Sequence, residues 1–385
     1  MKNKWILPVI LGLILVLIAL ICVCIFIEKK DRPEGTVPGT SEQTKPSQSV
    51  TTAPSTEPIQ STAPSETTAP PTTQAPTQPQ LQNRNPFTGV SQDEPFTARP
   101  FLISINNNKN AMPMCGLLEA DIVFEMLVNS YSTRCLALVT DVNAIERIGA
   151  IRSLRFNFID LAQAYDGIVV YASGSRIVLT DLKEAGVDHV NALSGNNGGA
   201  FYREPGRLAS GYAKEHTLFT IPALMAQYAQ KLGYSITADA QKDYGFRFAE
   251  DGTPVGGETA NTITMSFFTR NKKTTMYYDA ATQLYQYHQY GQNMVDGNTN
   301  EPLTFRNVFT LFAVNNNVDV YHIADLLGSG DGYYACGGKI VPIKWYREED
   351  SDPFTFTLAD GTPLEQGVGN SYVGIIPVGS AFTYQ

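Results

Sequence analysis

The sequence predicts an α/β domain built on a mixed sheet with helices, followed by a β-rich domain, with a membrane anchor and a disordered linker in front. Three observations predict this order. Residues 5–27 carry no charge, and residues 41–80 include 30 Ser, Thr, Pro or Gln. From residue 83 strand-like and helix-like patterns alternate, and after about residue 235 strands dominate. We therefore divide the chain into an anchor (1–30), a linker (31–82), an N-terminal domain (83–235) and a C-terminal domain (236–385).

The predicted anchor is the uncharged run of 23 residues from Trp5 to Ile27. As a helix it would measure about 34 Å, enough to cross the hydrocarbon core of a membrane. A cleaved signal peptide has a shorter apolar stretch and a small-residue cleavage site. Neither Cys22 nor Cys24 follows the small residues typical of a lipoprotein signal. We expect an uncleaved, single-pass anchor in the cell membrane with its N-terminus in the cytoplasm.

The linker supplies the reason for this orientation. Residues 41–80 contain no aromatic residue and no cysteine, and they cannot bury enough apolar surface to fold. In an extended, proline-rich form they would reach about 120 Å. Such a tether is typical of a domain held away from a bacterial membrane, and a cytoplasmic spacer is the alternative. We expect the body of the protein to be extracytoplasmic.

Charge and composition exclude several classes of function. The formal net charge is −9, and because the first 30 residues (+3) and the linker (−3) cancel, all of it lies on the body. An acidic body lacks the basic surface that nucleic-acid binding requires, and it repels anionic wall polymers unless a local basic site opposes the field. The four histidines and five cysteines show no zinc-site spacing. The sequence predicts no metal, no cofactor and no nucleic-acid partner. Cys115, Cys135 and Cys336 permit at most one disulfide, and whether Cys115 and Cys135 pair stays open.

The N-terminal domain is predicted to contain four strands and three helices. We expect the strands at residues 100–105, 121–128, 135–139 and 168–172. A first helix follows Ser153 as its N-cap and runs to about Tyr165. A second follows the Ser173–Ser175 turn and ends at Gly186. A third runs from about Thr220 to Gly233, with Pro222 in its first turn.

The C-terminal domain is predicted to be almost entirely strands. Turn signals such as Asp251-Gly252 and Asp360-Gly361 separate them, and a short helical turn is expected near residues 322–327. The expected strands are 262–268, 274–278, 284–290, 304–312, 332–336, 340–345, 354–357 and 372–376.

A series of ordered motifs resembles the YerB-like family of bacterial envelope proteins, a two-domain family whose biochemical function is not established. The resemblance covers nearly all of residues 86–377. The motifs are Asn85-Pro86-Phe87-Thr88-Gly89, Ala120 to Glu125, Thr133-Arg134, Ile148 to Arg155, Gly328 to Tyr334, Gly338-Lys339, Lys344-Trp345, Gly369-Asn370-Ser371 and Ile376-Pro377. The resemblance implies an envelope protein with two domains, often carried as a lipoprotein.

The chain departs from the family pattern at several positions. Tyr171 stands where the family tends to have a histidine, and Ser173 stands in place of a glycine. The family's Asp-Asn-His stretch is here Asn106-Asn107-Asn108. A transmembrane segment replaces the usual lipobox. Chemistry that needs the missing histidines or the missing aspartate is therefore in doubt for this chain.

The best candidate site is a pair of predicted helix starts. Arg152, Ser153 and Arg155 lie at one, and Ser173, Gly174 and Ser175 lie at the other. Free N–H groups, the helix dipole and the planar guanidinium all favour an anion such as a carboxylate or a phosphate. If both helices start at one edge of the sheet, they form a crevice beyond the strand ends. The alternative is structural: the two arginines would pair with internal acids, namely Asp121, Glu125 or Asp160.

Other candidate residues carry weaker signals. Arg203 could line the same pocket or lie on the surface, and His216 could be a general base or a structural residue. N-capping explains Ser153 and Ser175 better than nucleophilic catalysis does, and a strand turn explains Asp331 better than a phosphate loop. We expect a ligand-binding or interaction module of the cell envelope, with a small anionic or cell-wall ligand or a membrane-protein partner. An envelope hydrolase or transferase using His216 with Arg152 and Arg155 is the alternative.

Overall fold

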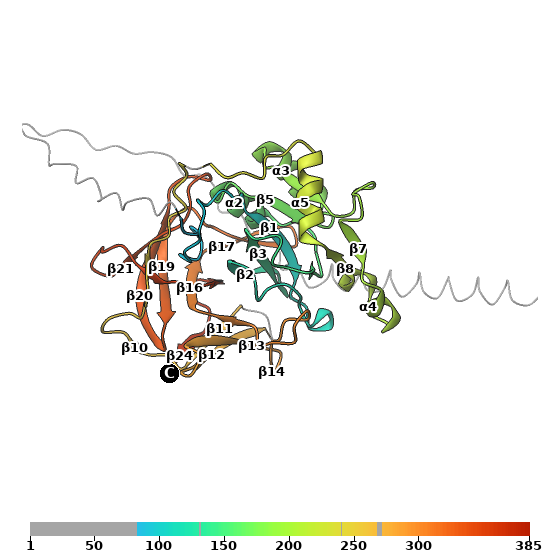
Figure 1. Ribbon diagram of the computed structural model, residues 1–385. Coiled ribbons are helices and arrows are strands. Elements are labelled where there is room, and N and C mark those ends of the chain that lie inside the picture. Colours follow the sequence, from blue (N-terminus) through green and yellow to red (C-terminus); the bar gives the residue numbers. More distant parts are fainter. Residues whose placement is uncertain (1–82, 131, 240, 268–271) are drawn as a thin grey trace, which may run out of the picture. The chain divides into compact units, whose positions relative to one another are not determined.

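The computed structural model describes residues 83–130, 132–239, 241–267 and 272–385 (Figure 1). The predicted anchor and linker lie outside the described residues. Within these ranges, none of the helices has both the length and the apolar character that crossing a membrane requires.

The main sheet joins strands from both predicted domains. It has eleven strands within the described residues, and its central strands β2 and β23 pair in parallel although they lie far apart in the sequence. The order is β10 (Glu258–Thr259), β20 (Lys339–Arg347), β19 (Gly328–Cys336), β16 (Asn307–Ala313), β23 (Ser371–Pro377), β2 (Ile122–Asn129), β3 (Ser132–Val139), β1 (Phe101–Asn106), β5 (Ile168–Tyr171) and β6 (His189–Asn191), with β21 (Thr355–Leu358) paired to β20.

The sheet is mixed in direction. Strands β1, β5 and β6 are mutually parallel, while β3 runs antiparallel between β1 and β2. All residues of β1 and β5 are buried, as expected of strands covered on both faces. Because parallel strands end at the same edge, the carboxyl ends of β1, β5 and β6 lie together.

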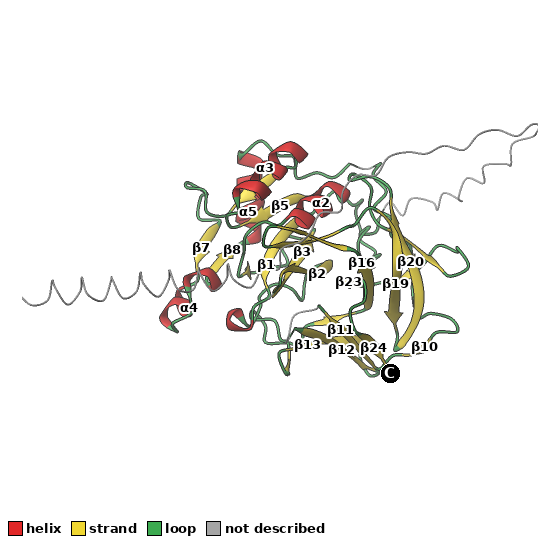
Figure 2. Ribbon diagram, turned by 180° about the vertical axis from the view of Figure 1, so that it is seen from behind, coloured by secondary structure: helices red, strands yellow, loops and turns green. Residues whose placement is uncertain are grey.

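Helices cover one end of this sheet on both faces (Figures 1 and 2). The helices α2 (Phe156–Ala164) and α3 (Arg176–Ala185) pack through Phe158, Leu161 and Val178 into the cluster that contains Leu102 and Leu136. The helix α5 (Pro222–Lys231) packs into the opposite cluster, which contains the intervening strand residues. Successive residues of a strand pack into the two clusters in turn, because their side chains point alternately to the two faces of the sheet.

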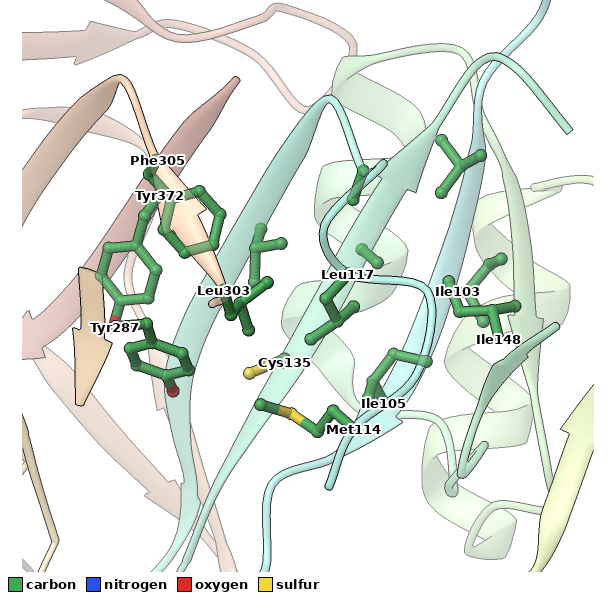
Figure 3. Close-up of a cluster of buried hydrophobic side chains, with 14 of the residues drawn as sticks. Ile103, Ile105, Met114, Leu117, Cys135, Ile148, Tyr287, Leu303, Phe305 and Tyr372 are labelled. Carbon is green, nitrogen blue, oxygen red and sulfur yellow. The ribbon is translucent and has the colours of Figure 1, made fainter. Parts of the chain in front are cut away.

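A second, smaller sheet packs against the central strands β16, β23 and β2 of the main sheet. Its order is β14 (Gln292–Asn293), β13 (Leu284–Gln289), β12 (Lys273–Asp279), β11 (Thr262–Ser266) and β24 (Phe382–Tyr384), with β15 (Thr304–Phe305) beside β13. Figure 3 shows Tyr287, Phe305 and Tyr372 beside the buried side chains of β1 and β3. The rings of Tyr287 and Phe305 each lie 5.5 Å from the ring of Tyr372.

Short elements complete the fold. They are β4 (Ile148–Gly149), β7 (Phe201–Arg203) and β8 (Leu218–Thr220) in one sheet, the hairpin β17 (Asn315–Val318) and β18 (Tyr321–Ala324), the pair β9 (Phe248–Ala249) and β22 (Gln366–Gly367), the helix α4 (Pro205–Ala209), and the 3-10 turns η1 (Lys109–Ala111) and η2 (Lys214–His216). Cys115, Cys135 and Cys336 are buried free thiols.

The mixed α/β architecture and the strand-rich C-terminal region are confirmed. Four local expectations are wrong. The segment expected as a helical turn at 322–327 begins with strand β18, and the predicted strand 304–312 is divided into β15 and β16. The third helix begins at Pro222 because Thr220 still belongs to β8, where it faces Phe201. Asp331 lies within strand β19, opposite Lys344, and not in a turn.

Candidate anion-binding site

The loop before α2 crosses the carboxyl ends of β1 and β5. Its backbone is held at both strands: the Arg152 N–H donates to the Ser104 carbonyl at 2.9 Å, and the Arg152 carbonyl accepts from the Ala172 N–H at 2.8 Å. The Leu154 N–H donates to the carbonyl of Ser173 at 3.0 Å. These bonds place the two segments predicted as a site side by side at the expected edge of the sheet.

Ser153 does not cap the first helix. The chain stays extended through Arg155, which is the N-cap residue of α2 and makes no capping bond with its side chain. The Ser153 carbonyl accepts instead from Arg134 Nη1 at 2.6 Å and from Ser104 Oγ at 3.2 Å. The prediction of Ser153 as an N-cap is therefore wrong, because tertiary contacts fix this residue outside the helix.

Three arginines meet at this loop: Arg134 from β3 and Arg152 and Arg155 from the loop itself. We call them the arginine cluster. Burial, followed by the charges of Arg155 and Arg152, lowers the pKa of Arg134 well below its usual range. Burial lowers the pKa of Arg155 to about 10. Positive charges that are buried close together, away from water, destabilise the folded protein unless an anion accompanies them.

None of the ion pairs within the described residues includes an arginine of this cluster. The acids considered as structural partners are bonded elsewhere. Asp121 accepts from Thr140, Glu125 pairs with Lys272 at 2.9 Å, and Asp160 accepts from an asparagine of its own helix. The Arg155 guanidinium lies instead over the ring of Tyr321, 5.2 Å from its centroid.

Three buried polar side-chain atoms of the two predicted segments lack partners in the described part of the chain. Arg152 Nε, Arg155 Nε and Ser175 Oγ are buried and have no hydrogen-bond partner among the described residues. Most buried polar side-chain atoms in proteins are bonded, so each exception calls for an explanation. An anion is one kind of acceptor that would satisfy groups of this type.

The Ser173–Ser175 turn leads from β5 into α3. Ser173 is exposed and has a φ of +67°, and its N–H donates to Asn191 Oδ1 at 3.4 Å. Ser175 occupies the N-cap position of the ten-residue helix α3 but makes no side-chain capping bond. The expectation that capping explains the Ser175 hydroxyl is therefore wrong. The positive dipole end of α3 lies at this turn.

The turn η2 borders the arginine cluster. Arg152 Nη1 donates to the Glu215 carbonyl at 3.4 Å, and Arg203 Nη1 donates to the Lys214 carbonyl. Arg203 belongs to β7 and is half-buried, so its hydrogen bond to Lys214 links the turn to that strand. The structure therefore brings Arg203 to the turn beside the cluster, with its guanidinium bound to the main chain.

His216 ends the same turn and is 7% exposed. Its Nδ1 lies 2.8 Å from Asn106 Nδ2, an amide donor, so Nδ1 acts as the acceptor. Burial lowers the pKa of His216; the charge of Glu215 opposes this effect, and the charges of Arg152 and Arg207 act in the same direction as burial. The Nδ1 atom thus faces an amide rather than a carboxylate.

Sequence reasoning missed Arg134, Asn106 and Tyr321 as parts of the site. Arg134 carried a signal, since it is a charged residue that opens a run of apolar strand residues. Its position depends on the antiparallel register of β3 and β1, in which Arg134 faces Asn106. Arg207 was also missed: its Nη1 donates to the carbonyls of Ala111, at 2.7 Å, and His216, at 3.1 Å.

Two surface cavities, of about 770 and 890 Å³, lie elsewhere, and none of the predicted site residues lines either one. In the part of the chain that the structure describes, no group of three His, Cys, Asp or Glu side chains is arranged to hold a metal ion. The chemistry available at the loop is therefore that of guanidinium groups, a hydroxyl and a helix N-terminus, which together suit an oxyanion.

Comparison with known proteins agrees with this description of the fold. Residues 87–235 match the model of the "Protein of unknown function (DUF3048) N-terminal domain" and residues 263–373 match that of its C-terminal domain. The chain belongs to the DUF3048 family.

The resemblance to the YerB-like family is confirmed by a named protein and by a crystal structure, both of YerB from Bacillus subtilis. A Bacillus subtilis (strain 168) protein named "Putative lipoprotein YerB" is 25% identical over 297 residues, which cover 76% of this chain and 86% of the relative. The crystal structure of YerB protein from Bacillus subtilis has a TM-score of 0.67 and 23% identity, and the match covers 78% of this chain and 99% of that one. This second comparison shows the fold alone.

Proposed function

We propose that this protein is tethered to the cell membrane, lies outside the cytoplasm, and binds an anionic ligand of the cell envelope at the arginine cluster. The observation that carries the proposal is the absence, within the described residues, of an ion pair at Arg134, Arg152 and Arg155, together with the unpartnered hydroxyl of Ser175. The ligand group that fits is a carboxylate or a phosphate.

Tethering rests on the sequence and on the relative. The uncharged run 5–27 is long enough for a membrane anchor, and the linker that follows is typical of a spacer outside the membrane. The relative's name describes a lipoprotein, which is held to a membrane by a different device. We propose that the anchor keeps the binding site within about 120 Å of the membrane surface.

Binding is favoured over catalysis by the state of His216. A general base needs an accessible nitrogen and a group that stabilises its protonated form. His216 accepts an amide hydrogen at Nδ1 and is buried, and both features favour the neutral imidazole against the opposing charge of Glu215. The arginine cluster would bind an anion without any proton transfer.

The test is a sedimentation assay with the full-length protein in detergent and purified cell walls. We expect binding without release of wall fragments, and loss of binding in Arg134→Gln and Arg152→Ala. Lys183→Gln is the matched control: it removes one positive charge at an exposed position in the last turn of α3. Fragment release that disappears in His216→Ala would establish an enzyme instead. Equal binding by Arg134→Gln and the parent would refute the proposal.

A further inference from the structure

A second candidate site lies at the end of the main sheet away from the arginine cluster. It contains the motif Gly328 to Tyr334, which the proposed anion site does not use. The cavity of about 770 Å³ is lined by this stretch of β19, by the end of β16 and by the start of β24. Its volume is within the range of small-molecule sites. The base of the β17–β18 hairpin closes one side through Val314 and Asp325.

One wall of this cavity, which we call the aromatic groove, is made of three half-buried rings. Phe382 lies 4.8 Å from Tyr333 and 5.8 Å from Phe312, measured between ring centroids. Trp345 forms part of the lining and is 2% exposed, and its indole N–H donates to the Phe312 carbonyl at 3.2 Å. Gly330 permits this packing, because a Cβ there would lie 2.5 Å from the indole.

Polar groups line the same groove, and two of them have an oxygen atom without a hydrogen-bond partner among the described residues. Ser380 is 9% exposed, and its Oγ has no partner among the described residues. Asp325 is exposed; its Oδ1 accepts the Leu327 N–H at 3.3 Å, and its Oδ2 has no hydrogen-bond partner within the described ranges. Asp331 is already paired with Lys344. The groove therefore offers ring surfaces, one free carboxylate oxygen and a buried hydroxyl.

We infer that the aromatic groove binds a saccharide. A pyranose ring presents C–H groups that pack on the negative face of an aromatic ring, and its hydroxyls donate to a carboxylate and to a serine. A purely apolar ligand would leave the buried Ser380 hydroxyl without a partner. A cation would meet only one unpaired carboxylate in the groove, since Lys344 neutralises Asp331. A neutral sugar also avoids repulsion from the body's charge of −9.

The test uses the full-length protein in detergent and follows the fluorescence of Trp345. The chain has two tryptophans, Trp5 and Trp345, so a Trp5→Phe background leaves the groove as the only source of signal. The probes are cellotetraose and the tetramer of N-acetylglucosamine, with calorimetry in parallel. We expect saturable binding of at least one probe. Neither heat nor a fluorescence change with either probe would overturn the proposal.

Variants separate the groove from the rest of the surface. Asp325→Asn should weaken saccharide binding about 10-fold, because a charged acceptor is lost. Tyr333→Leu should weaken it about 5-fold, because the ring face is lost while bulk is kept. Asp319→Asn is the matched control: Asp319 is exposed, has a φ of +55° that asparagine also adopts, and does not line the groove. Thermal unfolding checks that each variant is folded.

Two further outcomes decide the ligand class. If Asp325→Asn and Asp319→Asn bound the saccharide with equal affinity, the saccharide would bind elsewhere on the protein and the proposal would be overturned. Saturable binding of tetramethylammonium that Asp325→Asn abolishes, with no binding of either saccharide, would make the groove a cation site and would also overturn it.

Discussion

Replacing Lys272 with methionine should destabilise the protein through a single buried carboxylate. Glu125 is 0% exposed, and its carboxylate is 2.9 Å from Lys272 Nζ. Burial opposes ionisation of Glu125, but Lys272 and the hydrogen-bond donors around it outweigh burial and lower its pKa. The donors are Asn107, Thr133, Thr274, Tyr287 and Tyr372, at 2.7 to 2.9 Å.

The size of the destabilisation follows from the unpaired charge that Lys272→Met leaves in the core. Lys272→Met removes the countercharge and leaves an ionised carboxylate in the core, which costs about 3–5 kcal/mol of the free energy of unfolding. The double variant Glu125→Gln/Lys272→Met removes both charges and should be more stable than Lys272→Met alone. Lys273→Met is the matched control, since Lys273 is the exposed neighbour and its loss should change stability by less than about 0.5 kcal/mol.

The assay is denaturant unfolding of the full-length protein, followed by the fluorescence of Trp345 in the Trp5→Phe background. A cost for Lys272→Met that equals the cost for Lys273→Met would refute the reasoning. So would a double variant less stable than Lys272→Met, because the cost is assigned to an unpaired charge and not to lost packing.

For three other substitutions we expect specific changes in the stability of the protein. Burial raises the pKa of Asp160 to about 6, so this group favours the folded state below pH 4 and loses that contribution as the pH rises through 6. Asp160→Asn should therefore stabilise the protein at pH 8 by up to about 3 kcal/mol and leave stability at pH 3.5 unchanged, as denaturant titrations at both pH values would show. Gly330→Ala should lower stability by about 1–3 kcal/mol and shift Trp345 emission, because the added Cβ meets the indole; an unchanged spectrum would contradict this. Gly186→Ala should cost only about 1 kcal/mol in thermal unfolding, since Gly186 has a φ of +66° but no atom within 4 Å of an added Cβ.

The parts of the fold that the sequence predicted are those with strong local signals. The strand β5 is an uninterrupted apolar run between Gly167 and the Ser173 turn, and α3 ends at Gly186 as expected. The hairpin of β17 and β18 was missed because it is polar and rich in asparagine, so neither a strand pattern nor a turn pair stands out.

The candidate site was predictable only in part, and the reason is physical. Helix starts and arginines can be read from the sequence, and the structure brings both segments to one edge. The contribution of Arg134 depends on strand register, and the position of Ser153 depends on contacts from Arg134 and Ser104. Long-range pairing of this kind leaves no periodic signal in a single sequence.

The most direct test of the anion site is to locate an anion in it. Crystals of the protein soaked in selenate would be measured at the selenium absorption edge. We predict an anomalous peak within hydrogen-bond distance of the Arg134 and Arg155 guanidinium groups and of Ser175 Oγ, and its loss in Arg134→Gln crystals. Selenate bound only at other basic residues, with the arginine cluster empty, would contradict the account.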